Sequence, residues 1–244
     1  MKSNTFFFGL IFFLVLAGIP SQVSPQVPLF SGLKKTIVID PGHGGNDTGA
    51  RGTDKALEKD VTLSFAKTMK AALHKTYHVT LTRTDDYSID NQSRTETANR
   101  SGADLFISLH AGGNFIHESQ GIGIYYYERG PGPDFNPNTD QDALNKNIPP
   151  ASWTRTQEKY SPISHALAQS LAEHFAKGSL HRNIHVESLA LVVLSGASMP
   201  AVLIELGYIT SPFDEKRMAN PDYISDFSKE FCTAIDEYFS IYSK

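Results

Sequence analysis

Three side chains that can bind a metal ion or move a proton stand at the ends of short apolar runs. His43 follows the run TIVID within a glycine-rich turn, His110 closes the run LFISLH, and Glu205 closes the run AVLIE. Ligand crevices in open α/β sheets lie outside the carboxyl ends of the strands, so we expect these side chains on one rim. Imidazole and carboxylate together suit a catalytic zinc ion, which takes three protein ligands. Because the spacing is long-range and no local HExxH motif is present, ordinary strand-end roles stay open.

The same runs belong to an alternating series of strands and helices. Each run is short and rich in β-branched or aromatic side chains, as buried strands are. The predicted strands are Thr36–Asp40, His78–Arg83, Leu105–His110, Gly123–Tyr127, Ala190–Leu194 and Ala201–Glu205. Amphipathic helices are predicted at Glu58–Lys75, Ser93–Arg100, Ser161–Lys177 and Tyr223–Tyr242. This alternation predicts an α/β fold: a single domain with a mostly parallel twisted central sheet flanked by helices.

Two acidic residues have both a structural and a catalytic interpretation. Glu58 opens a predicted helix, where a carboxylate commonly stabilises the positive end of the helix dipole. Glu205 ends an apolar strand, and burial there would raise its pKa toward the range that suits a general base near neutral pH. An ion pair with a nearby arginine is the alternative role for Glu205.

Charge and cysteine content exclude several classes of protein. The 244 residues include 22 Lys and Arg against 26 Asp and Glu, a net charge of −4, so no basic excess favours nucleic acid as a partner. The single cysteine, Cys232, allows neither an internal disulfide nor a cysteine-rich zinc knuckle.

The N-terminal segment has the pattern of an export signal. Lys2 precedes the apolar run Phe6–Ile19, whose 14 residues fall short of the roughly 20 that a membrane-spanning helix needs. We therefore predict a secretory signal peptide at residues 1–24, with an uncleaved N-terminal anchor as the alternative. Because no cysteine follows the run, lipid anchoring is excluded, and no stable membrane anchor is expected after signal cleavage.

The remaining chain, residues 33–244, is predicted to be one catalytic domain with an inserted loop at about 128–160. That stretch carries five prolines and no sustained periodicity. A loop of this length inside a compact domain is usually functional or disordered.

Several segments resemble the zinc-dependent N-acetylmuramoyl-L-alanine amidases of the third amidase family. The similarity runs in the same order from about Thr36 to the C-terminal helix, through IVIDPGHGGNDTGARG, LEKDVTL, VTLTRTDD, RTETANRSGADLFISLHA and MPAVLIELGYIT. It implies one zinc ion per chain, held by His43, Glu58 and His110, with Glu205 as the catalytic glutamate. It also implies peptidoglycan as the substrate, cleaved between the lactyl group of N-acetylmuramic acid and L-alanine.

This chain departs from the family pattern at two positions, and more than one function and location stay open. The family commonly has Asn two residues after the last histidine, where this chain has Gly112, and Gly-Phe after the glutamate region, where it has Gly207-Tyr208. In some relatives an inserted helix covers the zinc until a protein activator displaces it. Here Asp140–Lys146 is the candidate for a short helix and Trp153 for stacking on a sugar, with a plain solvent loop as the alternative. The rival functions are a zinc peptidase acting on stem peptides or cross-links, and a noncatalytic wall-binding protein. A periplasmic location is expected first, and an extracellular or cell-wall location second.

Overall fold

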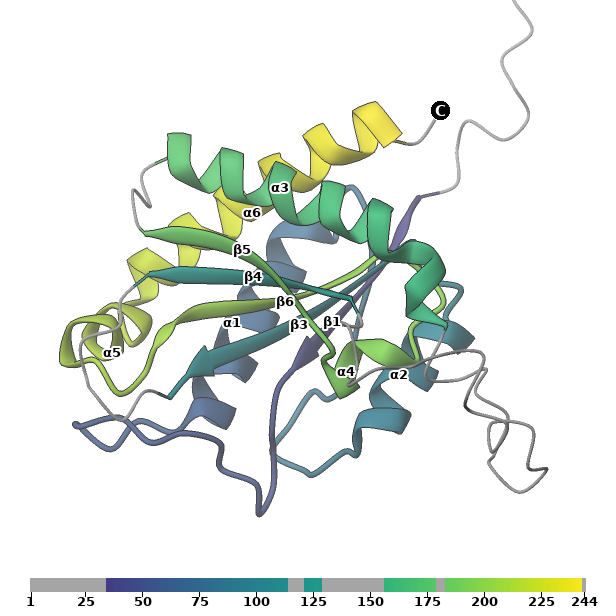
Figure 1. Ribbon diagram of the computed structural model, residues 1–244. Coiled ribbons are helices and arrows are strands. Elements are labelled where there is room, and N and C mark those ends of the chain that lie inside the picture. Colours follow the sequence, from purple (N-terminus) through teal and green to yellow (C-terminus); the bar gives the residue numbers. More distant parts are fainter. Residues whose placement is uncertain (1–33, 114–120, 129–155, 179–182, 243–244) are drawn as a thin grey trace, which may run out of the picture. The chain divides into compact units, whose positions relative to one another are not determined.

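A computed structural model describes residues 34–113, 121–128, 156–178 and 183–242, and its centre is a six-stranded sheet (Figure 1). The strands are β1 (Thr36–Pro41), β2 (His78–Leu81), β3 (Leu105–Gly112), β4 (Ile122–Tyr127), β5 (Ile184–Leu189) and β6 (Ala201–Tyr208). Their order across the sheet is β2-β1-β3-β6-β4-β5. The first four strands in this order are parallel, whereas β4 pairs antiparallel with β6 and parallel with β5. The sheet is therefore mixed and mostly parallel, as predicted.

Helices cover both faces of the sheet. They are α1 (Glu58–Leu73), α2 (Asn91–Arg100), α3 (Ser161–Lys177), α4 (Val192–Ser195), α5 (Pro212–Met218) and α6 (Pro221–Tyr242), with the 3-10 turn η2 (Gln157–Tyr160) before α3. Helices α1, α3 and α6 pack their apolar sides on one face, and α2 and α4 pack on the other (Figure 1). Alternate residues of the central strands divide between the two cores: Ile37 and Ile39 face the first, and Val38 faces the second.

Local sequence signals explain where several helices begin. The Asp90 side chain accepts a hydrogen bond from the Ser93 amide and so caps α2, and Ser211 caps α5 in the same way. Pro212 and Pro221 stand at the first positions of α5 and α6, where the missing N–H costs nothing. No side chain of the described residues caps helix α1, and the first residue of the helix, Glu58, is buried.

One predicted strand is wrong. Residues 190–194 do not pair in the sheet; Val192–Ser195 forms the single-turn helix α4, whose Val193 and Leu194 are buried in the second core. The strand in this region is β5, Ile184–Leu189, which lies at the sheet edge and carries polar side chains. A short apolar run does not distinguish a buried strand from a buried helical turn, and this misled the prediction.

The structure describes only part of the predicted insertion and none of the predicted signal peptide. The predicted signal peptide, and residues 129–155 of the predicted insertion with Asp140–Lys146 and Trp153, lie outside the described residues. Gln157, near the end of the predicted insertion, is buried and donates hydrogen bonds to the carbonyls of Ala197 and Met199. Among the described helices, none has the length and apolarity that a membrane crossing requires.

Candidate metal centre and active site

His110 and Glu205 lie side by side on neighbouring strands. They are register partners on the parallel strands β3 and β6, close to the carboxyl end of each. The ladder becomes irregular directly after His110, before Gly112 pairs with Tyr208. The two residues that the sequence placed at strand ends therefore share one edge of the sheet.

His43 reaches the same edge from the turn that follows β1. Its φ of 62° is unusual for a residue other than glycine, and the preceding Gly42 amide donates to the Leu109 carbonyl of β3 at 2.9 Å. Gly42 makes the close approach feasible: a Cβ atom there would lie 2.6 Å from His110 Nε2 and 2.8 Å from the Leu109 carbonyl oxygen. The rings of His43 and His110 meet edge to face, with their centroids 5.0 Å apart.

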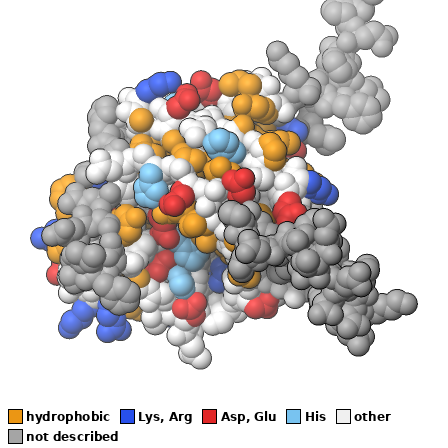
Figure 2. Space-filling view, in the orientation of Figure 1, with side chains coloured by type: hydrophobic (Ala, Val, Ile, Leu, Met, Phe, Trp, Pro, Cys, Tyr) orange, Lys and Arg blue, Asp and Glu red, His pale blue; other side chains and the backbone are white. Residues whose placement is uncertain are grey.

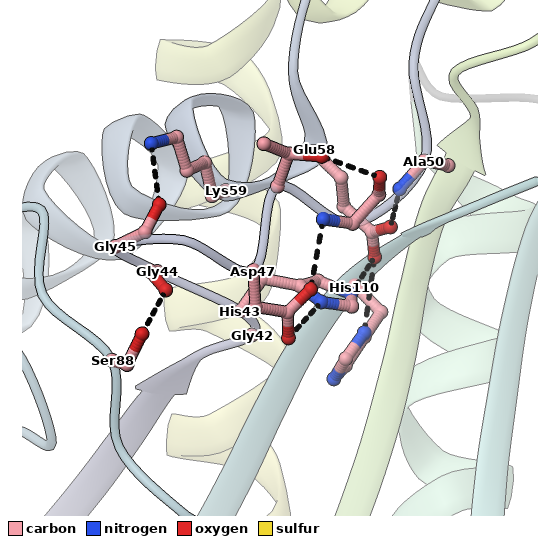
Figure 3. Close-up of polar contacts among 12 residues, drawn as sticks. Gly42, His43, Gly44, Gly45, Asp47, Ala50, Glu58, Lys59, Ser88 and His110 are labelled. Carbon is pink, nitrogen blue, oxygen red and sulfur yellow. Dashed lines mark hydrogen bonds and ion pairs between the residues drawn. The ribbon is translucent and has the colours of Figure 1, made fainter.

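Glu58 joins the two histidines (Figure 3). Its Oε1 lies 3.1 Å from His43 Nε2 and 3.0 Å from His110 Nδ1. The backbone amides of Ala111 and Ala50 donate to Oε1 and Oε2, at 3.0 and 2.8 Å, and fix the carboxylate in place. Ligand atoms of all three residues lie within 4.8 Å of one another, and two nitrogen donors with one carboxylate oxygen match the ligand chemistry of zinc. The donor set therefore fits a metal ion held by these three protein ligands.

The charges in this cluster support one another. Burial alone would raise the pKa of Glu58, but hydrogen bonds and charge from His110 and His43 outweigh burial and hold that pKa well below its usual value. Burial also opposes the charged form of His43, yet Glu58 and Asp47 raise its pKa above 6.5. The carboxylate of Glu58 is therefore ionised at neutral pH, as a metal ligand must be.

The pKa of Glu205, in contrast to that of Glu58, is raised. Burial raises its pKa to about 7, and the negative charge of Glu58 adds to the rise, against the opposing effects of His110 and His43. Its Oε2 is buried and has no hydrogen-bond partner among the residues that the structure describes. A carboxylate that gains and loses a proton near neutral pH, beside a metal-ligand cluster, has the property required of a general base.

A further layer of residues holds the turn that carries His43. Asp47 Oδ2 lies 2.8 Å from His43 Nδ1 and fixes the ring so that Nε2 faces Glu58. Arg94 donates to the carbonyls of Pro41 and His43, and it pairs at 2.7 Å with the fully buried Asp40. Sequence reasoning did not find Asp47 or Arg94 as site residues, although both lie within segments that carry the family resemblance.

A groove of about 650 Å³ opens beside the cluster. His43, His110 and Glu205 line it together with Arg94 and the apolar residues of α4. Histidine and acidic side chains lie interspersed on this face of the molecule (Figure 2). A three-residue ligand cluster beside a buried carboxylate, open to a groove, is typical of metal-dependent hydrolases.

Comparisons with known proteins agree with the assignment to the metal-dependent hydrolases. Residues 37–237 match the family model described as N-acetylmuramoyl-L-alanine amidase. The chain is 30% identical over 223 residues to the N-acetylmuramoyl-L-alanine amidase AmiA of Escherichia coli K12, covering 85% of this chain and 75% of that protein. Among solved structures, AmiC2 of Nostoc punctiforme superposes with a TM-score of 0.67 at 28% identity, covering 84% of this chain and 97% of that one. The catalytic domain of CwlV from Bacillus (Paenibacillus) polymyxa gives a TM-score of 0.66 at 25% identity, covering 85% and 99%.

The chain belongs to the N-acetylmuramoyl-L-alanine amidase family. It is an amide hydrolase whose substrate is peptidoglycan. The geometry brings together all four residues predicted from the sequence: His43, Glu58 and His110 in one cluster, and Glu205 beside it.

Proposed function

We propose that His43, Glu58 and His110 bind one zinc ion and that Glu205 is the general base of the amidase reaction. The bond cleaved joins the lactyl group of N-acetylmuramic acid to L-alanine. The observation that carries this proposal is the sharing of Glu58 Oε1 by both histidines, directly beside a buried carboxylate with a raised pKa. Zinc in such a site acts as a Lewis acid that activates water and polarises the amide carbonyl.

In this reaction each residue of the site has its own role. Glu205 accepts the proton of the attacking water through its carboxylate and returns it to the amine nitrogen of the leaving L-alanine. Its pKa of about 7 allows both steps near neutral pH. Glu58 stays ionised throughout, and Asp47 and Arg94 keep His43 in its orientation. The products are a free stem peptide and an intact glycan strand.

Location and regulation are parts of the same proposal. Peptidoglycan lies outside the cytoplasmic membrane, which supports export by the segment at residues 1–24, with the periplasm as the first expected location. We also propose that a protein activator regulates the enzyme through the inserted loop at about 128–160, most of which is residues 129–155. Deleting those residues would raise activity if they cover the site, and would leave it unchanged if they form a plain loop.

The replacement Glu205→Gln tests the assignment of the base. Glutamine keeps the size of the side chain but accepts no proton, so we expect activity to fall by about 10²- to 10⁴-fold while zinc content stays at one ion per chain. Glu173→Gln is the matched control, because the Glu173 side chain is 71% exposed on α3. A Glu205→Gln variant with near-normal turnover would contradict the proposal.

A further inference from the structure

A single row of residues crosses four strands of the sheet and extends beyond the metal cluster. His110 on β3 pairs with Glu205 on β6, Glu205 pairs with Gly123 on β4, and Gly123 pairs with His185 on β5. Residues in register on neighbouring strands point to the same face of a sheet. His185 therefore lies on the face of the sheet that carries Glu205, two strands away.

Gly123 leaves the place between Glu205 and His185 without a side chain, and Tyr125 fills it. A Cβ atom on Gly123 would lie 2.9 Å from the Tyr125 hydroxyl oxygen and 2.8 Å from His185 Nε2. The Tyr125 hydroxyl lies 2.8 Å from His185 Nε2, and the two rings meet edge to face with centroids 5.5 Å apart. Tyr125 thus leans back along β4 and presents its hydroxyl above Gly123, one strand spacing from the base.

The surroundings of this hydroxyl determine its chemistry. Burial raises the pKa of Tyr125 above its ordinary value, and Tyr208, Glu205 and Glu187 raise it further, so the hydroxyl keeps its proton at neutral pH. A hydroxyl has one proton to donate and two lone pairs. When the Nε2–H tautomer of His185 donates to the hydroxyl oxygen, the hydroxyl keeps its own proton for a carbonyl or hydroxyl oxygen of a ligand. Glu187 is the register partner of Tyr125 on β5, and its carboxylate would repel an anionic group, so a neutral oxygen fits best.

We propose that Tyr125 is a substrate-binding residue whose hydroxyl binds a neutral carbonyl or hydroxyl oxygen of peptidoglycan, and that His185 is the positioning residue that orients it. The proposal rests on the function proposed above, because it places this pair beside Glu205 as the base. Such oxygens occur on both sides of the scissile bond: in the N-acetyl group of the sugar and in the amide groups of the stem peptide.

The test compares Tyr125→Phe with Tyr126→Phe. Tyr126 is the neighbouring tyrosine on β4, but it lies on the opposite face of the sheet, where it packs against the core of α1, α3 and α6 and stacks on His165. Its hydroxyl is therefore a matched control. With purified disaccharide-tetrapeptide as substrate, we expect Tyr125→Phe to lower kcat/KM about fivefold, the usual effect of losing one neutral hydrogen bond. Zinc content and melting temperature should equal those of Tyr126→Phe. Equal kcat/KM values for the two variants would overturn the proposal.

Two modified substrates identify the bound oxygen. If Tyr125 binds the sugar, the effect of Tyr125→Phe should vanish on a muropeptide without its N-acetyl group. If it binds the peptide beyond the first residue, the effect should vanish on a substrate whose stem ends at L-alanine. An effect that persists on both substrates supports a contact at the scissile amide itself.

A double variant tests the role of His185. If His185 acts through Tyr125, His185→Ala should lower kcat/KM in the native protein but have no further effect in the Tyr125→Phe background. Independent losses in the two backgrounds would overturn the pairing. If neither the native protein nor a variant without residues 129–155 releases stem peptide, the proposed function and this inference are overturned together. An active protein with a normal Tyr125→Phe variant would overturn the inference alone.

Discussion

Replacing Glu205 with glutamine should stabilise the metal-free protein at alkaline pH and leave its stability unchanged at acidic pH. One oxygen of the buried carboxylate has no hydrogen-bond partner in the described part of the chain, so ionisation in the folded state carries a desolvation penalty. Glutamine has the same shape and no charge, and it resembles the protonated acid. The variant therefore removes the penalty at every pH at which Glu205 would be ionised.

The magnitude follows from the pKa of Glu205. This pKa is about 7 in the folded protein, against an ordinary value of 4.5. A difference of that size corresponds to about 3 kcal/mol of unfolding free energy. Because the folded-state pKa is raised, the unfolding free energy is highest below pH 4.5, where Glu205 is protonated in both the folded and the unfolded state. The unfolding free energy falls as the pH rises through about 7. The gain from Glu205→Gln should accordingly be near zero at pH 4.5 and reach about 3 kcal/mol above pH 8.

Urea unfolding in the presence of a chelator measures this difference at pH 5 and pH 8.5. Glu173→Gln serves as the control, since its exposed carboxylate should change the unfolding free energy by little at either pH. If Glu205→Gln is no more stable than the native protein at pH 8.5, the ionised carboxylate is well solvated. The explanation of Glu205 as a base tuned by burial would then be refuted.

Two further predictions concern the residues that hold the metal cluster. Asp47→Ala removes the partner of His43 Nδ1 and should weaken zinc binding by about 10- to 100-fold, which a titration against a competing chelator measures; unchanged affinity would show that the ring is held without it. Arg94→Met leaves the charge of Asp40 buried without its ion-pair partner and should cost about 3 kcal/mol or more in urea unfolding, with part of that loss recovered in the double variant with Asp40→Asn.

The central strands were predictable because their composition reflects burial on both faces. β1, β3 and β6 are nearly continuous apolar runs, and the sequence predicted each within three residues of its observed end. β5 was not predictable in the same way, since it lies at the sheet edge and contains His185, Glu187 and Ser188. Its neighbour, α4, has the apolar composition of a strand but packs as one helical turn.

The residues of the site also differ in how far the sequence predicts them. His43, His110 and Glu205 could be inferred from their places at strand ends, because parallel strands bring their carboxyl ends to one edge. Glu58 needed the family resemblance, since the first residue of a helix is commonly acidic for reasons of helix stability alone. Asp47, Arg94 and the pair of Tyr125 and His185 depend on turn geometry and strand register, which no spacing in the sequence indicates.

The most direct test of the central claim is mass spectrometry of the products that the purified protein releases from intact peptidoglycan, with and without a zinc chelator. The assignment of a zinc amidase predicts free stem peptides that begin with L-alanine, and their loss on chelation with recovery when zinc is restored. Peptides cut at another bond, or release that persists in the chelator, would contradict it.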